Sequence, residues 1–191
     1  MSAGRLAQLV LSLEEVSLLF TQLTTEQLSV LLTALGNSEG LKLRRLNLTR
    51  NDLSSVPSPL LSRAVLRLEE ATLFMTKLSP DQVRVISQAV LSQKISLKNL
   101  GLSYNNLSFV SSELLSKTVI KLEEVGLRNT RLNSQQINSI CKAIEDCPGP
   151  ELRLRRLKVC HEVKSLGVQD QLAKAEEKLS RLPNVKRRRV S

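Results

Sequence analysis

The sequence predicts an α/β fold in which short strands and helices alternate along a right-handed solenoid, a horseshoe arc with a parallel inner sheet and outer helices. Three observations predict it. An eleven-place leucine frame recurs along the chain, helix-start signals follow the frames at fixed positions, and aromatic residues make up only 2% of the chain. An interior of leucine with few rings is typical of stacked repeats, because each repeat contributes one thin layer of core.

The frame is clearest at residues 97–107, which read L-K-N-L-G-L-S-Y-N-N-L. Leucines at its fourth and sixth places alternate with the period of a β-strand, and Asn105 at the ninth place requires the backbone to turn out of the strand. Five further copies, the last one degraded, begin at Leu13, Leu43, Leu68, Leu122 and Leu154. This pattern predicts a leucine-rich repeat solenoid.

Two kinds of repeat alternate along the chain, because short and long spacings between frames alternate and give a paired unit of about 54 residues. The Thr-type repeats carry threonine at the ninth place, and the Asn-type repeats carry asparagine there: Thr21, Thr76 and Thr130 against Asn51 and Asn105. We expect each of these side chains to bond the backbone of the neighbouring turn. Stacked copies would then form a ladder that supplies partners for backbone groups outside the sheet.

A helix-start signal follows each Thr-type frame. A small polar residue precedes a glutamine by three places, which is a capping box: Thr24 with Gln27, Ser79 with Gln82, and Asn133 with Gln136. Apolar residues follow at matched helical positions. Cys141 occupies one of them, so we expect a small buried hydrophobe rather than a nucleophile. Shorter helices are expected after the Asn-type frames, within residues 54–67 and 108–121.

The repeats divide the chain into three expected segments. Residues 1–164 form the solenoid, with about five full repeats and a degenerate sixth, residues 165–182 form a C-terminal capping helix, and residues 183–191 form a flexible basic tail. The chain opens in mid-repeat, because residues 5–13 resemble the last turn of an Asn-type helix and no polar cap precedes them. Either this edge is weak or the chain is a piece of a longer protein.

Composition indicates the cellular compartment and the classes of partner that the protein could have. The sequence shows neither a membrane span nor a secretory signal. Its three scattered cysteines do not make a disulfide framework. We therefore expect a reducing compartment, the cytoplasm or the nucleus. Residues 151–191 carry +7 of the formal net charge of +10. The run Lys186, Arg187, Arg188 and Arg189 is interpreted as a solvated terminus, with a nuclear import signal or a weak polyanion contact as alternatives.

Catalytic chemistry is not expected. His161 adjoins Cys160, but neighbouring residues of a strand point to opposite faces, and no acid stands at a spacing that would orient the histidine. Cys141, Cys147, Cys160 and His161 lack the paired spacing of a zinc site. The sequence also contains no glycine-rich phosphate loop. We therefore expect a protein that is not an enzyme and uses no cofactor.

The candidate binding surface lies where the frame turns its side chains away from the core. The third, fifth and seventh places should face the concave side of the sheet, and the eighth place should lie on its rim. The third-place column alternates in charge: Glu15, Arg45, Glu70, Asn99, Glu124 and Arg156. This column would either hold the strands in register and in solution or form an electrostatic address for a ligand.

The seventh and eighth places hold three of the four aromatic residues of the chain. Aromatic residues, methionine and arginine on one exposed surface are typical of protein interfaces. The predicted partner-binding residues are Leu19, Phe20, Arg50, Phe74, Met75, Tyr104 and Arg128. The alternative is that the rings fold over one another and contact no partner.

The strand frame, the Asn positions and the alternation of two repeat types over residues 13 to about 160 resemble the ribonuclease-inhibitor-like class of leucine-rich repeats. This class also occurs in the C-terminal regions of NOD-like receptors and in the GTPase-activating protein for Ran. The resemblance implies a protein partner bound on the concave face or its rim, with GTPase activation or a nucleic-acid contact through the basic tail as alternatives. The short repeats and the ladder threonines depart from the class.

Overall fold

A computed structural model describes residues 2–92, 95–159 and 167–182. Its strands form one parallel sheet in sequence order: β1 (Glu15–Ser17), β2 (Arg45–Asn47), β3 (Glu70–Thr72), β4 (Asn99–Gly101), β5 (Glu124–Gly126) and β6 (Arg156–Lys158). The helices are α1 (Ala3–Leu11), α2 (Thr25–Asn37), α3 (Ser58–Leu66), α4 (Pro80–Ser92), α5 (Ser112–Lys121), α6 (Ser134–Asp146) and α7 (Gln169–Ser180). The predicted α/β repeat fold is confirmed.

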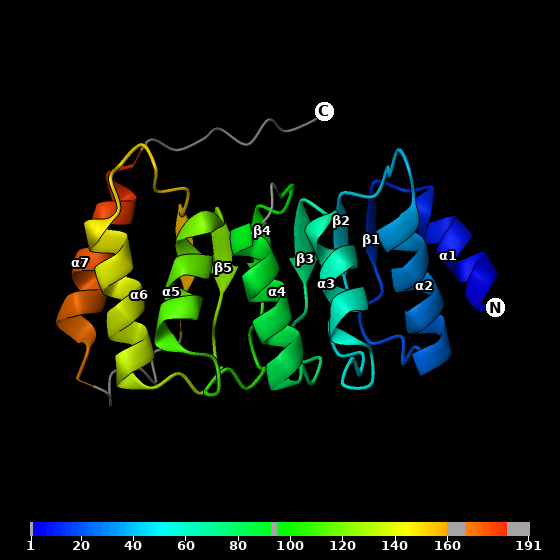
Figure 1. Cartoon of the computed structure of the whole chain (residues 1–191), viewed down its shortest axis with the longest axis horizontal. Helices are drawn as coiled ribbons and strands as arrows, with labels where there is room; N and C mark the ends of the chain where they lie inside the picture. Colours follow the sequence, from blue (N-terminus) through cyan, green and yellow to red (C-terminus); the bar gives the residue numbers. More distant parts are fainter. Residues whose placement is uncertain (1, 93–94, 160–166, 183–191) are drawn as a thin grey trace.

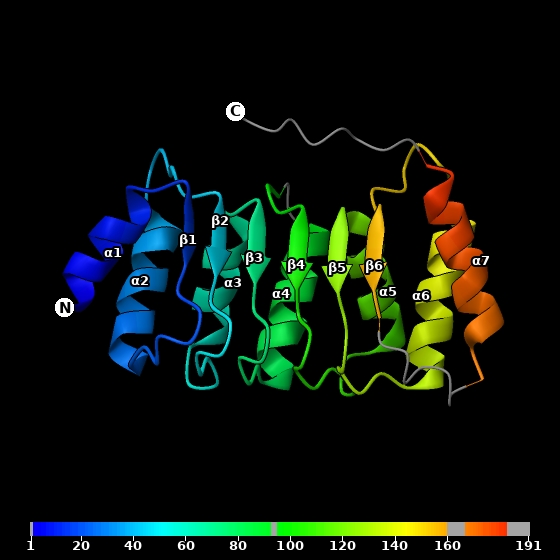
Figure 2. The ribbon, with the colours of Figure 1, turned by 180° about the vertical axis from the view of Figure 1, so that it is seen from behind.

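The molecule has two layers. Figure 1 shows the helices side by side in front of the strands, and Figure 2 shows the same strands from behind with no helix over them. One face of the sheet therefore packs on the helices, and the other face is left for solvent or a partner. This arrangement follows from the frame, whose leucines at the fourth and sixth places point toward the helices.

The core between the layers is built almost entirely from aliphatic side chains. The leucines at the first, fourth and sixth places of the interior frames are buried, as Leu97, Leu100 and Leu102 show at 0%, 2% and 3% exposure. Cys141 fills a leucine position of α6 at 1% exposure. Burial raises the pKa of its thiol to about 11, with Glu145 and Glu176 adding to the effect. A thiol in this setting is not a nucleophile at neutral pH.

Each long helix begins with the predicted capping box. In α4 the Ser79 hydroxyl accepts the N–H of Gln82 at 3.2 Å, and the Gln82 side chain accepts the N–H of Ser79 at 2.8 Å. The same reciprocal pair opens α2 and α6. Gln82 also donates to the carbonyl oxygens of Leu53 at 2.7 Å and Val56 at 2.6 Å. A long helix is thereby bound to the turn of the preceding Asn-type repeat, a contact that the sequence pattern did not indicate.

The ladder forms at the asparagines. Asn105 donates to the carbonyl oxygen of Leu73, one repeat away, at 2.7 Å and accepts the N–H of Leu78 at 3.1 Å. The prediction is wrong for the threonines, because Thr76 donates to Leu73 of its own turn at 2.9 Å. Across repeats the threonine hydroxyl reaches only the asparagine side chain, as Thr21 does with Asn51 at 3.2 Å, whereas the longer amide offers a donor and an acceptor to the backbone.

The two ends of the stack differ. At the C-terminal end α7 packs beside α6, and Lys178 donates to the carbonyl oxygens of Glu145 and Cys147 at 2.6 and 2.7 Å. At the N-terminal end α1 has the same nine-residue length as α3. Cys160, His161 and the basic run 186–189 lie outside the described residues. Within the described part of the chain, no helix has the length and apolarity needed to cross a lipid bilayer.

Candidate functional site

The third-place column is a row of cross-strand charge pairs. Glu15 lies opposite Arg45, Arg45 opposite Glu70, and Glu124 opposite Arg156 in the strand register. Arg45 donates to Glu15, with their charged atoms 2.7 Å apart, and this hydrogen bond raises the pKa of the arginine. Most of these charges are satisfied by one another, which favours the register interpretation of the column over a ligand address.

The second-place column repeats the arrangement. Glu69 accepts Arg44 of the β2 repeat on one side at 2.5 Å and Lys98 of the β4 repeat on the other at 2.8 Å. These two cations, Lys98 first, hold the pKa of Glu69 below its ordinary value. Thr-type frames carry a pair of glutamates at the second and third places. Asn-type frames carry cations there, except for Asn99, which donates to Glu70 at 3.2 Å, so adjacent strands attract each other along the sheet.

The eighth place of each of the first five frames lies in the left-handed backbone region. Phe20 has φ 61°, Arg50 58°, Met75 54°, Tyr104 60° and Asn129 53°. Residues other than glycine and asparagine rarely adopt this conformation, because their Cβ crowds the carbonyl oxygen. The backbone reverses here after each strand, and the side chain at the turn projects outward. Sequence reasoning missed this geometry because glycine, the usual signal, is absent from these turns.

The predicted site residues lie on one surface, which we call the rim surface: Leu19, Phe20, Arg50, Phe74, Met75, Tyr104 and Arg128. Leu19 is 51% exposed, Phe20 56%, Met75 44% and Tyr104 45%, and Phe74 is half-buried. The guanidinium carbon of Arg50 lies 5.1 Å from the ring centroid of Phe20. The rings of Phe74 and Tyr104 lie 4.6 Å apart at 46°. The structure thus brings four of these seven residues together in two contacting pairs, Arg50 with Phe20 and Phe74 with Tyr104.

The seventh place is more covered than the sequence predicts. Thr49 and Ser103, expected to face solvent, are each 8% exposed. The Ser103 hydroxyl accepts the N–H of Arg128 from the neighbouring strand at 3.1 Å. In the register the small seventh-place residues of the Asn-type frames alternate with the larger residues of the Thr-type frames. The larger side chains therefore cover the smaller ones.

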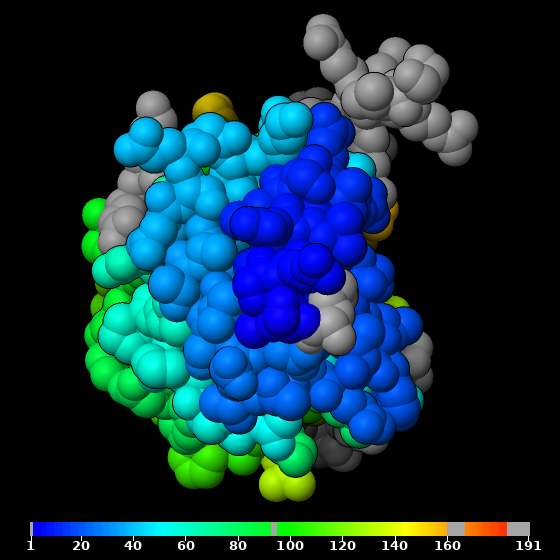
Figure 3. All heavy atoms as spheres, turned by 90° about the vertical axis from the view of Figure 1, so that its right-hand side faces the viewer, coloured from blue at the N-terminus to red at the C-terminus, as the bar shows by residue number. Residues whose placement is uncertain are grey.

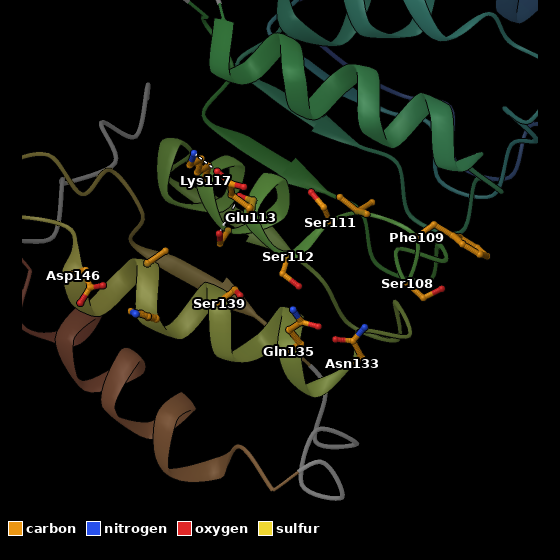
Figure 4. Close-up of a pocket in the computed structure, with 14 residues that line it drawn as sticks. Ser108, Phe109, Ser111, Ser112, Glu113, Lys117, Asn133, Gln135, Ser139 and Asp146 are labelled. Atoms are coloured by element: carbon orange, nitrogen blue, oxygen red, sulfur yellow. Dashed lines mark hydrogen bonds and ion pairs between the residues drawn. The ribbon is translucent and has the colours of Figure 1, made fainter.

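Phe109 is the exposed aromatic residue that the sequence analysis left aside, at 68% exposure. It lies at one end of a shallow groove of about 880 Å³ between α5 and α6. Figure 4 shows the polar lining of this groove, with Glu113 bonded to Lys117 at 2.6 Å and with Gln135 and Ser139 on the α6 side. The equivalent residue of the preceding Asn-type repeat is Ser55. A phenylalanine at a place where the matching repeat has serine could have indicated from the sequence that this ring is exposed. The groove offers hydroxyls and ion pairs but no buried unpaired group that would select a ligand.

Metal ligands do not gather on the parts of the chain that the structure describes, where no three residues among His, Cys, Asp and Glu are close enough to hold an ion. On the strand turns that the structure describes, the pKa of Asp52 is lowered to about 2, because its carboxylate accepts hydrogen bonds from Lys77 and Ser54. Lys77 and Asp52 form an exposed ion pair at 2.7 Å. This pairing accounts for the shift without a catalytic role.

Comparison with known structures supports the fold. The chain is similar to the tropomodulin C-terminal domain from Caenorhabditis elegans, with a TM-score of 0.50 and 17% sequence identity over 93% of this chain and 90% of that one. A comparison with models of protein families finds no match, and a comparison with curated protein sequences finds none. At this level of identity the likeness extends to the architecture alone, and a function has to be argued from the surface.

Proposed function

We propose that this protein is a non-catalytic recognition module that binds a partner protein through the rim surface. The single observation that carries the proposal is the exposure of Phe20 and Tyr104, at 56% and 45%, on the turns that follow β1 and β4 at the same edge of the sheet. Exposed rings on a surface that also presents Met75 and Arg50 have the composition of interface hot spots.

The rim surface is organised for binding before a partner arrives. Arg50 rests over the Phe20 ring, and Tyr104 rests on Phe74. Each contact restricts the rotamers of an exposed side chain, so less conformational entropy is lost when a partner covers it. The left-handed turns also fix the direction in which each eighth-place side chain leaves the backbone. A partner therefore meets a preformed row of side chains.

The finer assignments are proposals of the same kind. The alternation of Thr-type and Asn-type repeats supports the ribonuclease-inhibitor-like class, and the buried free thiol of Cys141 supports a reducing compartment, the cytoplasm or the nucleus. No feature of the described residues favours GTPase activation over simple recognition. The nucleic-acid alternative depends on residues 186–189, which lie outside the described residues.

The test compares three forms of the full chain as baits for chemical cross-linking and capture. The wild type and Phe109→Ala should capture the same partner, because Phe109 is an equally exposed ring outside the rim surface. The double variant Phe20→Ala/Tyr104→Ala should weaken that partner's binding by about thirtyfold or more, the effect of removing one strong hot spot. Thermal unfolding should be nearly unchanged in all three. Undiminished binding by the double variant, or loss of binding by Phe109→Ala, would refute the assignment.

A further inference from the structure

The first Thr-type repeat is much less buried than its two copies. Leu13, at the first place of the frame, is 44% exposed, whereas the equivalent Leu68 and Leu122 are 1% and 0% exposed. Thr21, at the ninth place, is exposed, whereas Thr76 and Thr130 are 0% and 2% exposed. The same residue types at the same frame places therefore lack a neighbour in this repeat.

The exposed residues form one continuous surface, the end face, which consists of Leu9, Leu13, Val16, Leu18 and Thr21. Val16 and Leu18 are half-buried although their frame places are core in every interior repeat. Leu9 of α1 is 54% exposed, and the equivalent Ala64 of α3 is fully buried. Figure 3 looks onto this end of the stack, where α1 and the segment that follows it lie at the surface.

Backbone hydrogen bonds in the interior show which groups a strand beside β1 would meet at the end face. The N–H groups of Leu48, Arg50 and Leu53 donate to Thr72, Phe74 and Thr76 of the next repeat at 2.9, 3.0 and 2.9 Å. The pattern recurs one paired unit later, where Leu102, Tyr104 and Leu107 donate to Gly126, Arg128 and Thr130.

The matching acceptors of the first repeat are the carbonyl groups of Ser17, Leu19 and Thr21. Among the described strands β1 pairs only with β2, on its other side. The spacing of these carbonyls along β1 therefore fits the N–H groups of an Asn-type strand. An open strand edge of this kind is a template for a further strand.

The charges on this edge specify the same strand type. In the interior Glu69 is held between Arg44 of the preceding strand and Lys98 of the following one. Glu14 and Glu15 are the equivalent acids of the first frame, and here Arg45 of β2 lies on the inner side only. A strand with two adjacent cations at its second and third places would restore the interior arrangement on the outer side.

We infer that the end face binds an extended segment of another protein as a seventh, parallel strand, with two adjacent basic residues followed by leucines at alternate positions. The leucines would cover Leu13, Val16 and Leu18, the basic pair would lie against Glu14 and Glu15, and the N–H groups would reach the open carbonyls. A second copy of this chain docked edge to edge would place two glutamate pairs together, so it is the disfavoured occupant. This surface is distinct from the rim surface.

The probe is a fluorescent peptide of residues 41–53 of this chain, L-K-L-R-R-L-N-L-T-R-N-D-L, titrated into the full-length protein with anisotropy as the readout. The control peptide carries glutamate at both positions of the arginine pair and should bind about tenfold more weakly. Raising NaCl from about 50 to about 500 mM should weaken the first peptide, because exposed ion pairs are screened. Hydrogen exchange should slow at residues 15–21 when the peptide is bound.

Two variants place the binding on the end face. Leu13→Lys removes an apolar contact and adds a repelling cation, and Ser17→Pro blocks the open edge while leaving the hydrogen bonds to β2; each should weaken the peptide about tenfold or more. Tyr104→Ala, on the rim surface, should bind the peptide like the wild type, so failure here and failure of the proposed function are separable. Equal binding of both peptides, or of the wild type and both edge variants, overturns the inference. A dimer in sedimentation that Leu13→Lys dissolves would assign the end face to a second copy instead.

Discussion

Replacing Asn105 with alanine should lower the free energy of unfolding by about 2 to 6 kcal/mol. The side chain is 3% exposed, and its oxygen accepts the backbone N–H groups of Thr76 at 3.2 Å and Leu78 at 3.1 Å. Both N–H groups lose this acceptor in the variant, and a buried N–H left unpaired costs about 1 to 3 kcal/mol. The carbonyl of Leu73 adds little, because the Thr76 hydroxyl still donates to it at 2.9 Å.

The chain supplies two matched comparisons for this variant. Asn51 occupies the same place one paired unit earlier, but its oxygen accepts one backbone N–H, that of the half-buried Leu23, at 3.1 Å. Asn51→Ala should therefore cost about 1 kcal/mol, because water can reach the N–H that is left. Asn106 stands next to Asn105 and accepts only the local N–H and hydroxyl of Ser108. Asn106→Ala should cost less than about 1 kcal/mol.

Urea unfolding followed by circular dichroism gives the three free energies, and an unchanged denaturant slope would show that the unfolded states are comparable. The expected order of cost is Asn105→Ala, then Asn51→Ala, then Asn106→Ala. If Asn51→Ala cost as much as Asn105→Ala, the count of unpaired N–H groups would not be what sets the stability. The account of the ladder as a supply of backbone partners would then be wrong.

Two further predictions concern titratable groups. The first uses a variant in which Cys147 and Cys160 are replaced by serine, so that Cys141 is its only thiol. A thiol reagent at pH 7 should label this variant no faster than it unfolds, because burial raises the pKa of the Cys141 thiol to about 11. Rapid labelling in native buffer would contradict the burial. Lys77→Gln should raise the pKa of Asp52 from about 2 toward the ordinary 3.8. The Lys77–Asp52 ion pair stabilises the folded state above about pH 4, and this stabilisation is lost as the pH falls through about 2. Its contribution stays below about 1 kcal/mol because both groups are exposed. A carboxyl titration by NMR in both proteins measures the shift.

The repeat architecture was predictable because its causes are local in sequence. Leucines at alternate places specify a strand with one buried face, and Thr24 with Gln27 specifies a helix start. Both patterns recur, so each copy corroborates the others. The cross-strand charge pairs were predictable for the same reason, since equal spacing places Glu15, Arg45 and Glu70 in one row of the sheet.

What the sequence did not reveal depends on contacts between repeats. Ser103 looks like a solvent-facing residue, but the neighbouring seventh-place side chains cover it, and the frame of a single repeat contains no record of that coverage. The bridge from Gln82 to the preceding turn is hidden in a residue already explained as part of a capping box. The left-handed turns carry phenylalanine, arginine and tyrosine where glycine would have been the signal.

Those turns explain why the fold and the binding surface are specified separately. The eighth-place residue contributes a backbone conformation to each turn, and at four of the five turns its side chain is exposed, so the stack places little demand on its chemistry there. The turns that follow β1 to β5 hold five different residues, Phe20, Arg50, Met75, Tyr104 and Asn129. Each of the four that are not asparagine costs about 1 kcal/mol or more in the left-handed region, which a glycine would avoid. Large exposed side chains at a place where stability alone favours glycine fit the proposed binding role of the rim surface.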